Sequence, residues 1–184
     1  MDAIQAIRTR RSVRSFLPDP VPPELIAELV RDAACAPYAF VSLPEPWLFT
    51  VIAGRERVAG YGERAKAYAR DHRPYVRNYE WADRPDFSVF HGAPCVILIS
   101  GGENNPEARS ECDRAGQNLS LSAHARGLGS CWVGSPMLWL RDAGTRAELG
   151  IPDGFLPQAA FALGYPTGQP QAPQPLAPRT IWVG

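Results

Sequence analysis

The chain has 184 residues, with 19 basic and 19 acidic side chains, so its formal net charge is zero. A balanced charge excludes the basic excess typical of nucleic-acid-binding and polybasic membrane proteins, and no apolar run reaches the ~18 residues of a membrane-spanning helix. Because the sequence also starts without the plan of a signal peptide, we expect a soluble cytoplasmic protein with a single domain, residues 1–184.

Two helices are expected in the N-terminal part of the chain. Asp2 is placed to cap the first helix, with Ile4 and Ile7 on its buried side. The second helix begins at prolines 22–23. It should end before Pro37, because the residue before a proline avoids the helical conformation.

The rest of the chain alternates between short apolar runs and helical patterns. The apolar, β-prone runs predict strands, and the second of them is apolar throughout, which indicates a central position in a sheet. The strands are expected at 47–52, 95–100, 130–134 and 158–164. Helices are expected at 55–70, 106–126 and 138–149, with loop and short helix between 71 and 90.

The longest predicted helix, 106–126, stops at Gly127 in the usual glycine C-cap pattern. Its interior holds small residues on several faces, among them Ala115, Gly116 and Ser120. Neighbouring elements therefore approach this helix closely. It is either the central helix of the core or a helix that packs against its twin in a dimer.

The C-terminal segment from residue 165 has a proline every few residues and then the apolar end I-W-V. Such a tail is extended and cannot fold on itself, yet its apolar end is unfavourable to leave in water. We expect the tail to run in an extended form and to add a strand to a partner subunit.

Several common chemical motifs are absent from the sequence. G-L-G-S-C-W has a tryptophan where a dinucleotide-binding loop needs its third glycine, and it follows a helix instead of a strand. The cysteines are scattered without metal-ligand spacing, which predicts buried reduced thiols and no metal site. They are Cys35, Cys95, Cys112 and Cys131. The isolated histidines are interpreted as structural or surface residues; they are His72, His91 and His124.

Positive charge is concentrated in the stretch T-R-R-S-V-R-S-F, residues 9–16. Its guanidinium forks and hydroxyl suit an oxyanion such as a phosphate monoester. These groups belong to Arg10, Arg11, Ser12 and Arg14. The alternative is a solvated basic helix end, because the last turn of a helix favours cations. The residues alone favour this alternative.

Five stretches, in family order, resemble the flavin-dependent nitroreductase family. The first is R-R-S-V-R-S-F with the helix that ends in A-C-A-P, and the second is P-W-L-F-T-V-I. The third is A-P-C-V-I-L-I-S, and the fourth is D-R-A-G-Q-N-L-S-L-S-A-H-A-R-G-L-G-S-C-W-V-G. The fifth is A-L-G-Y-P with a late arginine. Together they cover most of the chain apart from about residues 55–90.

The resemblance implies an α+β sandwich, with a central, mostly antiparallel sheet flanked by helices. It also implies an intertwined homodimer with two FMN molecules at the subunit interface. About residues 168–184 of each chain would form the tail that embraces the partner and exchanges a strand with it. The composition of the C-terminal segment indicates the same exchange.

The resemblance further implies which residues bind the cofactor. Arg10, Arg11 and Ser12 would hold the FMN phosphate. Arg14 would lie near the N1/O2 edge of the flavin ring, where a cation stabilises the reduced flavin. Arg179 matches the late basic residue that reaches the same phosphate.

Two further segments would approach the flavin ring. Val133 and Gly134 fall where family backbone groups approach the N5 side, and the loop that begins at Pro37–Ala39 would reach the flavin across the dimer. In this loop the family has a serine, an asparagine and Q-P-W, whereas Y-A-F-V-S-L-P-E-P-W is about two residues longer and lacks the asparagine. Tyr38 and Phe40 either wall the flavin or substrate pocket, or Tyr38 fills the site that substrate normally uses.

The resemblance implies an FMN-dependent NAD(P)H oxidoreductase of the ping-pong type. NAD(P)H would deliver hydride to the flavin and leave, and a nitroaromatic, quinone or related small acceptor would take its place. The flavin supplies this chemistry, so no catalytic side chain is expected. The alternative is a flavin-binding or vestigial dimer without enzymatic activity, whose pocket is closed by the altered loop.

Overall fold

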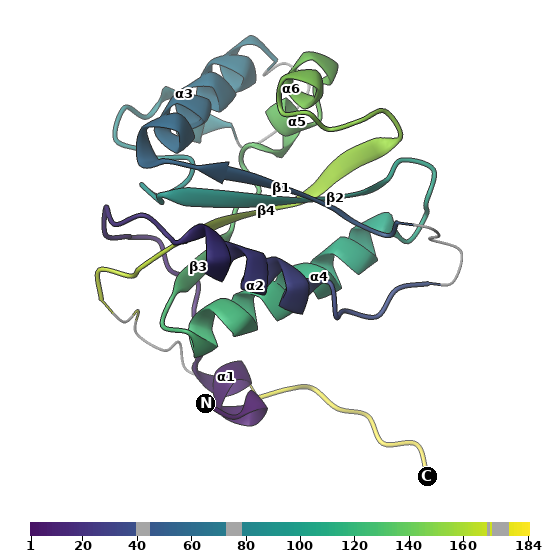
Figure 1. Ribbon diagram of the computed structural model, residues 1–184. Helices are drawn as coiled ribbons and strands as arrows, with labels where there is room; N and C mark the ends of the chain where they lie inside the picture. The colour runs from purple at the N-terminus through teal and green to yellow at the C-terminus, as the bar shows by residue number, and fades with distance from the viewer. Residues whose placement is uncertain (40–44, 73–78, 169, 171–176) are drawn as a thin grey trace.

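The structure, a computed structural model, describes residues 1–39, 45–72, 79–168, 170 and 177–184. In these ranges a four-stranded sheet lies between two layers of helices (Figure 1). The strands are β1 (Leu48–Ala53), β2 (Cys95–Gly102), β3 (Gly129–Trp132) and β4 (Phe155–Gly164). The helices are α1 (Ala3–Thr9), α2 (Pro23–Ala33), α3 (Arg55–Asp71), the 3-10 helix η2 (Glu80–Asp83), α4 (Ala108–Ala125), α5 (Met137–Leu140) and α6 (Ala143–Glu148).

The strands pair antiparallel throughout, in the order β1-β2-β4-β3. β2 lies inside the sheet, and its residues 95–101 are buried, which confirms the central position expected from its unbroken apolar run. Side chains alternate between the two faces of the sheet. Along β2, Val96 and Leu98 pack on one face, while Ile97 and Ile99 pack on the other. The α+β class with an antiparallel sheet flanked by helices is therefore confirmed.

Each face of the sheet carries its own set of helices. Figure 1 shows α3, α5 and α6 on one face, and α2 and α4 on the other. Leu29 of α2 and Leu119 of α4 pack with Phe161 of β4 on the second face. Val58 of α3 and Leu140 of α5 belong to the core of the first face. The sheet thus separates two apolar cores, and its edge strand β3 is left accessible to the N-terminal segment.

The long helix α4 is the central helix of the second core. A Cβ atom added to Gly116 would overlap the ring of Phe161 from β4, so glycine leaves the space that this ring fills. α4 ends as predicted at Gly127, which has a φ of +77° while the Leu128 N–H donates to the Ala123 carbonyl at 2.9 Å. Gly116 therefore serves packing within one chain. Neither α4 nor another helix in the described ranges is long and apolar enough to cross a membrane.

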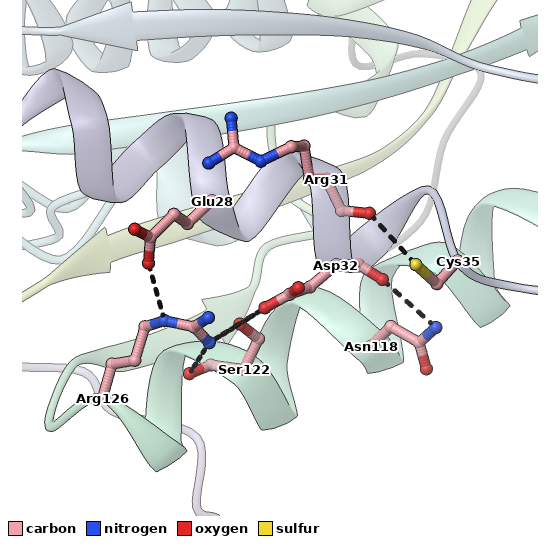
Figure 2. Close-up of polar contacts among 7 residues, drawn as sticks. All are labelled: Glu28, Arg31, Asp32, Cys35, Asn118, Ser122 and Arg126. Atoms are coloured by element: carbon pink, nitrogen blue, oxygen red, sulfur yellow. Dashed lines mark hydrogen bonds and ion pairs between the residues drawn. The ribbon is translucent and has the colours of Figure 1, made fainter.

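A polar network ties the C-terminal ends of α2 and α4 together (Figure 2). Arg126, which follows α4, forms ion pairs with Glu28 at 3.2 Å and with Asp32 at 2.9 Å. Asp32 also accepts a hydrogen bond from the Ser122 hydroxyl at 2.5 Å, and its carbonyl accepts one from the Asn118 amide at 3.5 Å. Isolated surface ion pairs contribute little, but these contacts share Asp32 and Arg126. They fix the position from which the chain leaves α2.

The prediction that Ile4 and Ile7 face the core is wrong within one chain. Asp2 caps α1 as expected and accepts a hydrogen bond from the Gln5 N–H at 2.8 Å. However, both isoleucine side chains are 57% exposed, and Ala6 is the buried residue of the helix. α1 lies outside the two main layers (Figure 1), and it contacts the body of the protein through Ala6 and Thr9 and not through the two isoleucines.

The cysteines follow the prediction at three of four positions. Cys95, Cys112 and Cys131 are buried free thiols, whereas Cys35 is exposed. Burial raises the pKa of both Cys95 and Cys112 to about 12, so these thiols stay protonated at neutral pH. Cys35 departs from the expectation because it lies in the turn after α2, with its side chain at the surface between the buried residues Ala33 and Ala36.

The helix expected at 138–149 is two short helices, α5 and α6. Asp142 separates them with an extended backbone, and its carboxylate accepts a hydrogen bond from the Thr145 N–H at 3.0 Å. An aspartate in this position caps a new helix start. The interruption therefore follows from a capping residue inside a pattern that otherwise has helical spacing.

Candidate functional site

The arginine-rich stretch 9–16 is docked on the edge of the sheet. α1 ends at Thr9, and the following backbone runs beside β3, with a parallel bridge between Ser12 and Ser130. The Val13 N–H donates to the Ser130 carbonyl at 3.0 Å. The N–H of residue 17 donates to the Tyr165 carbonyl at 2.8 Å, beyond the end of β4. The arginines are therefore carried by fixed backbone instead of a free helix end.

Close contact with β3 depends on Gly129. A Cβ atom at this position would lie between 2.6 and 2.8 Å from three side-chain carbons of Val13. Real Cβ contacts of this length do not occur without a shift of the backbone or the neighbour. The second glycine of G-L-G-S-C-W therefore lets the arginine-rich stretch lie directly on β3, which is a packing role and not that of a dinucleotide loop.

A hollow of about 500 Å³ opens where α1, the end of α4 and β3 meet. We call it the α1–α4 hollow. It is lined by Met1, Gln5, Thr9, Arg10, Arg11, Val13, Ser120, His124, Ala125, Gly127, Leu128, Ser130, Pro166, Gly168 and Pro170. Its volume lies within the range of roughly 300–1,000 Å³ that small-molecule sites occupy. Its wall combines two guanidinium groups with hydroxyls, which suits a phosphate monoester.

Arg11 contacts the end of α1 with one donor of its guanidinium and leaves another unpaired within the described part of the chain. Its Nη1 donates to the carbonyls of Arg8 at 2.9 Å and Arg10 at 2.7 Å, which is the helix-end role. Its Nε, by contrast, is buried and has no hydrogen-bond partner among the described residues. A buried unpaired donor is unfavourable unless a partner arrives. The guanidinium therefore has donor capacity that an anion in the hollow would satisfy, and the residues present fit a phosphate group.

Ser12 and Arg14 line a neighbouring, more open hollow of about 400 Å³, together with Thr167. Residues two apart in extended backbone face the same side of the chain, so Ser12 and Arg14 face the same hollow. Arg10 and Arg11 thus line one hollow, and Ser12 and Arg14 line the adjoining one, with Val13 in the wall of both. Arg14 lies near His91, whose pKa is lowered by burial and by the Arg14 charge. Among the described residues, His91 is also the non-glycine residue with a left-handed φ, +57°.

Val133 and Gly134 follow β3 directly, at the same edge of the sheet as the arginines. Val133 is buried, and its N–H donates to the Ala160 carbonyl at 2.8 Å. The half-exposed Trp132 ring lies against Gly134, where an added Cβ would approach it to 2.8 Å. The structure thus brings Val133 and Gly134 to the strand on which the arginine-rich stretch is docked.

The segment Pro37–Ala39 lies at the other end of α4. Arg114 donates from its Nε to the Pro37 carbonyl at 2.9 Å, and the Ala39 N–H donates to Glu111 at 2.6 Å. Glu111 is thirteen residues from His124 along one helix, which corresponds to roughly 20 Å. One chain therefore does not bring this segment to the α1–α4 hollow.

Within this segment Tyr38 is 47% exposed, and its ring packs edge-on against Trp47 with a centroid distance of 5.5 Å. Phe40, the other expected aromatic wall, lies outside the described residues. Arg179 lies in the exposed segment 177–184, which forms no helix or strand and is not part of the wall of the α1–α4 hollow. The segment 177–184 extends past α1, away from the sheet (Figure 1).

A third hollow, of about 290 Å³, lies between α3 and residues 85–92. Its wall includes the carboxylates of Glu63 and Asp86. The one buried cation of α3, Lys66, is paired with Glu63 at 3.1 Å. Carboxylates repel a phosphate group, so this hollow is a poor candidate for the same ligand.

Two polar residues near these segments were not predicted from the sequence. Glu111 is completely buried, and it accepts hydrogen bonds from Ala39 and, at 2.8 Å, from the Asn105 amide. His124 lines the α1–α4 hollow and contacts Thr9. Glu111 could have been noticed in the sequence, because it shares a helix face with small, apolar residues. The contact of His124 could not have been noticed, because its partner Thr9 is 115 positions away in the sequence.

Comparisons with known proteins identify the family to which the chain belongs. The sequence model of the nitroreductase family matches residues 7–165. A protein of Methanothermobacter thermautotrophicus, provisionally described as an NADH dehydrogenase/NAD(P)H nitroreductase, is 33% identical over 174 residues, which are 92% of this chain and 80% of that protein.

Solved structures show the same fold. A nitroreductase from Bacteroides fragilis with bound FMN has a TM-score of 0.84 at 24% identity, covering 100% of this chain and 99% of the other. An FMN-dependent nitroreductase from Clostridium difficile has a TM-score of 0.78 at 23% identity, with 98% of each chain covered. With the family match spanning β1 to β4 and the arginine-rich stretch, the chain belongs to the nitroreductase family.

Proposed function

We propose that this protein is an FMN-dependent oxidoreductase that takes electrons from NAD(P)H and passes them to a small oxidised acceptor. One observation carries the cofactor assignment. Two arginines line a hollow of about 500 Å³, and one of them has a buried Nε without a hydrogen-bond partner among the described residues. The family match and the name of the relative from M. thermautotrophicus support the choice of reaction.

Each residue has a separate task in this proposal. Arg10 and Arg11 would hold the phosphate of FMN in the α1–α4 hollow, and Ser12 would contribute its hydroxyl from the adjoining one. Arg14, which lines the same adjoining hollow two residues further along the stretch, would place its charge at the flavin ring. Val133 and Gly134 would approach the ring with their backbone. When bound, FMN supplies the two-electron chemistry, so no side chain is required as an acid or base.

The proposal includes a homodimer, because one chain leaves parts of the site apart. Pro37–Ala39 lie at the opposite end of α4 from the arginines, so this segment would complete the site of a second chain. Large apolar side chains are exposed on α1 and on the C-terminal segment, where Trp182 is 91% exposed. A tail that crosses to the partner would cover this surface and bring Arg179 to the partner's phosphate.

The acceptor class is a nitroaromatic, a quinone or a related planar oxidised molecule. Such acceptors match the half-exposed aromatic surface of Tyr38 at the segment that would reach the flavin. Nicotinamide and acceptor would occupy the same place in turn, because the sequence has no separate dinucleotide-binding loop. This implies a ping-pong mechanism.

Steady-state kinetics test this proposal. We expect parallel double-reciprocal plots when NADPH or NADH is varied at several fixed concentrations of a benzoquinone, because the first product leaves before the acceptor binds. Intersecting lines would show that both substrates bind together and would contradict a shared place. Tight FMN binding without turnover for either nicotinamide would favour the alternative, a flavin-binding dimer without enzymatic activity.

A further inference from the structure

The α1–α4 hollow contains a third basic group besides Arg10 and Arg11. His124 lies in the last turn of α4 and lines the hollow. Its Nε2 is 2.8 Å from the Thr9 hydroxyl, at the end of α1. The histidine is therefore held at the junction of α4 and the arginine-rich stretch, and not on a free surface.

The hydrogen bonds of Thr9 fix the state of this imidazole. The Thr9 hydroxyl donates its one hydrogen to the Gln5 carbonyl at 2.7 Å. With that hydrogen committed, the hydroxyl oxygen accepts from His124 in the tautomer that carries its hydrogen on Nε2. In the neutral ring, Nδ1 is consequently the nitrogen with the lone pair. A proton taken up by His124 would go to Nδ1 and would make it a second donor.

Two positive charges face the ring. Arg10 and Arg11, from the end of α1, lower the pKa of His124, although burial is the larger cause. Arg126, on the same helix end, is occupied by Glu28 and Asp32 of α2.

The rest of the described wall adds no negative charge. Met1, which carries the α-amino group, also lines the hollow and adds a further positive charge, while Ser130, Pro166, Gly168 and Pro170 are uncharged. No carboxylate is among the residues that line the described hollow. Burial and the two arginine charges therefore lower the pKa of His124 and favour its neutral form while the hollow holds no anion.

A phosphate group in the hollow would raise the pKa of His124 instead, because it carries about −1.5 to −2 charges near neutral pH. Resting on the proposed function, we propose that His124 is a third, proton-dependent ligand of the FMN phosphate, and that FMN binding is accompanied by proton uptake at Nδ1. The direction follows from linkage. A group whose pKa is higher in the complex than in the free protein strengthens binding at low pH, and this gain is lost as the pH rises through the pKa of the complex.

The test compares the full-length wild-type protein with His124→Gln in FMN titrations followed by quenching of flavin fluorescence. The glutamine amide can still donate to Thr9, but it cannot take up a proton. At about pH 6, just below the ordinary histidine pKa of about 6.5, we expect FMN to bind roughly tenfold more weakly to His124→Gln. At about pH 8.5 the two proteins should agree within about twofold, because both residues are then neutral.

Riboflavin and inorganic phosphate distinguish the source of the effect. Riboflavin lacks the phosphate, so its affinity should be the same for both proteins at both pH values, which also shows that the variant is folded. Inorganic phosphate should compete with FMN more strongly in the wild-type protein at low pH. Calorimetry of the wild-type protein in two buffers of different ionisation enthalpy should show more proton uptake with FMN than with riboflavin.

The outcomes separate this inference from the proposed function. If FMN binds tightly but the ratio between wild type and His124→Gln does not change with pH, His124 is not a proton-dependent ligand. A riboflavin affinity that changes as much as the FMN affinity would place His124 away from the phosphate and would also overturn the inference. If neither protein binds FMN at any pH, the cofactor assignment itself is wrong.

Discussion

The double variant Arg10→Ala, Arg11→Ala is expected to bind FMN about 10²–10⁴-fold more weakly than the wild-type protein, because two charge-assisted contacts of about 1.5–3 kcal/mol each would be lost. Both residues line the α1–α4 hollow, and Arg11 has a buried Nε without a partner among the described residues. Riboflavin affinity should change far less. The measurement is a pair of fluorescence titrations, with FMN and with riboflavin.

Arg8→Ala is the matched control for this variant. Arg8 lies in the last turn of α1 and contributes a charge to the same helix end, but its side chain does not line the α1–α4 hollow. Its carbonyl still accepts from Arg11 after the substitution. If Arg8→Ala weakens FMN binding as much as the double variant does, a general charge effect is responsible. If the double variant keeps its FMN affinity, the arginines belong to the helix end alone.

Gly129→Ala is expected to lower the free energy of unfolding by about 1–3 kcal/mol, as overpacking in a close contact does. The added Cβ would lie within 2.8 Å of three Val13 carbons, so β3 or the arginine-rich stretch has to move. Because Arg10, Arg11 and Ser12 are carried by that stretch, FMN affinity should fall together with stability. Urea unfolding and FMN titration of the same preparation measure both effects.

Gly60→Ala is the matched control, because here the same substitution is expected to stabilise the protein. Gly60 lies inside α3, is exposed, and has open space where a Cβ would be added. Alanine should stabilise this helix by about 0.5–1 kcal/mol, without a change in FMN affinity. Equal stability of Gly129→Ala and wild type would show that the stretch is loosely held on β3. It would also remove the structural basis for placing the arginines.

Much of the fold could be predicted from the sequence because the local signals agree with the tertiary structure. The apolar run of β2 indicated a strand buried on both faces, and Gly127 indicated the end of α4. The small residues of α4 indicated a close neighbour, which is Phe161 at Gly116. In each case the residue pattern reports a contact that any packed core must form.

Other features depended on information that a local pattern does not contain. Ile4 and Ile7 have the spacing of a buried helix face, yet α1 is placed where one chain does not cover them. The spacing between 138 and 149 continues through Asp142, where a capping hydrogen bond starts a new helix. Periodicity shows which residues can be buried together, but the surrounding elements decide whether they are.

In the candidate site, too, local features could be predicted from the sequence and long-range contacts could not. The arginine-rich stretch was visible in the sequence as a cluster of neighbouring residues. The contact between Thr9 and His124 was not, because the two positions are 115 residues apart. Glu111 was also missed, although it fixes the backbone of Ala39 at the other end of α4. Long-range polar pairs of this kind require the fold before they can be recognised.

Anaerobic titration of the FMN-loaded protein with NADPH or NADH is the most direct test of the central proposal that this chain is a flavin-dependent oxidoreductase. We predict that one of the two nicotinamides bleaches the visible absorbance of the bound flavin in proportion to the amount added, and that a quinone restores it. A flavin that stays oxidised with both nicotinamides, but is bleached by dithionite, would contradict the proposed function.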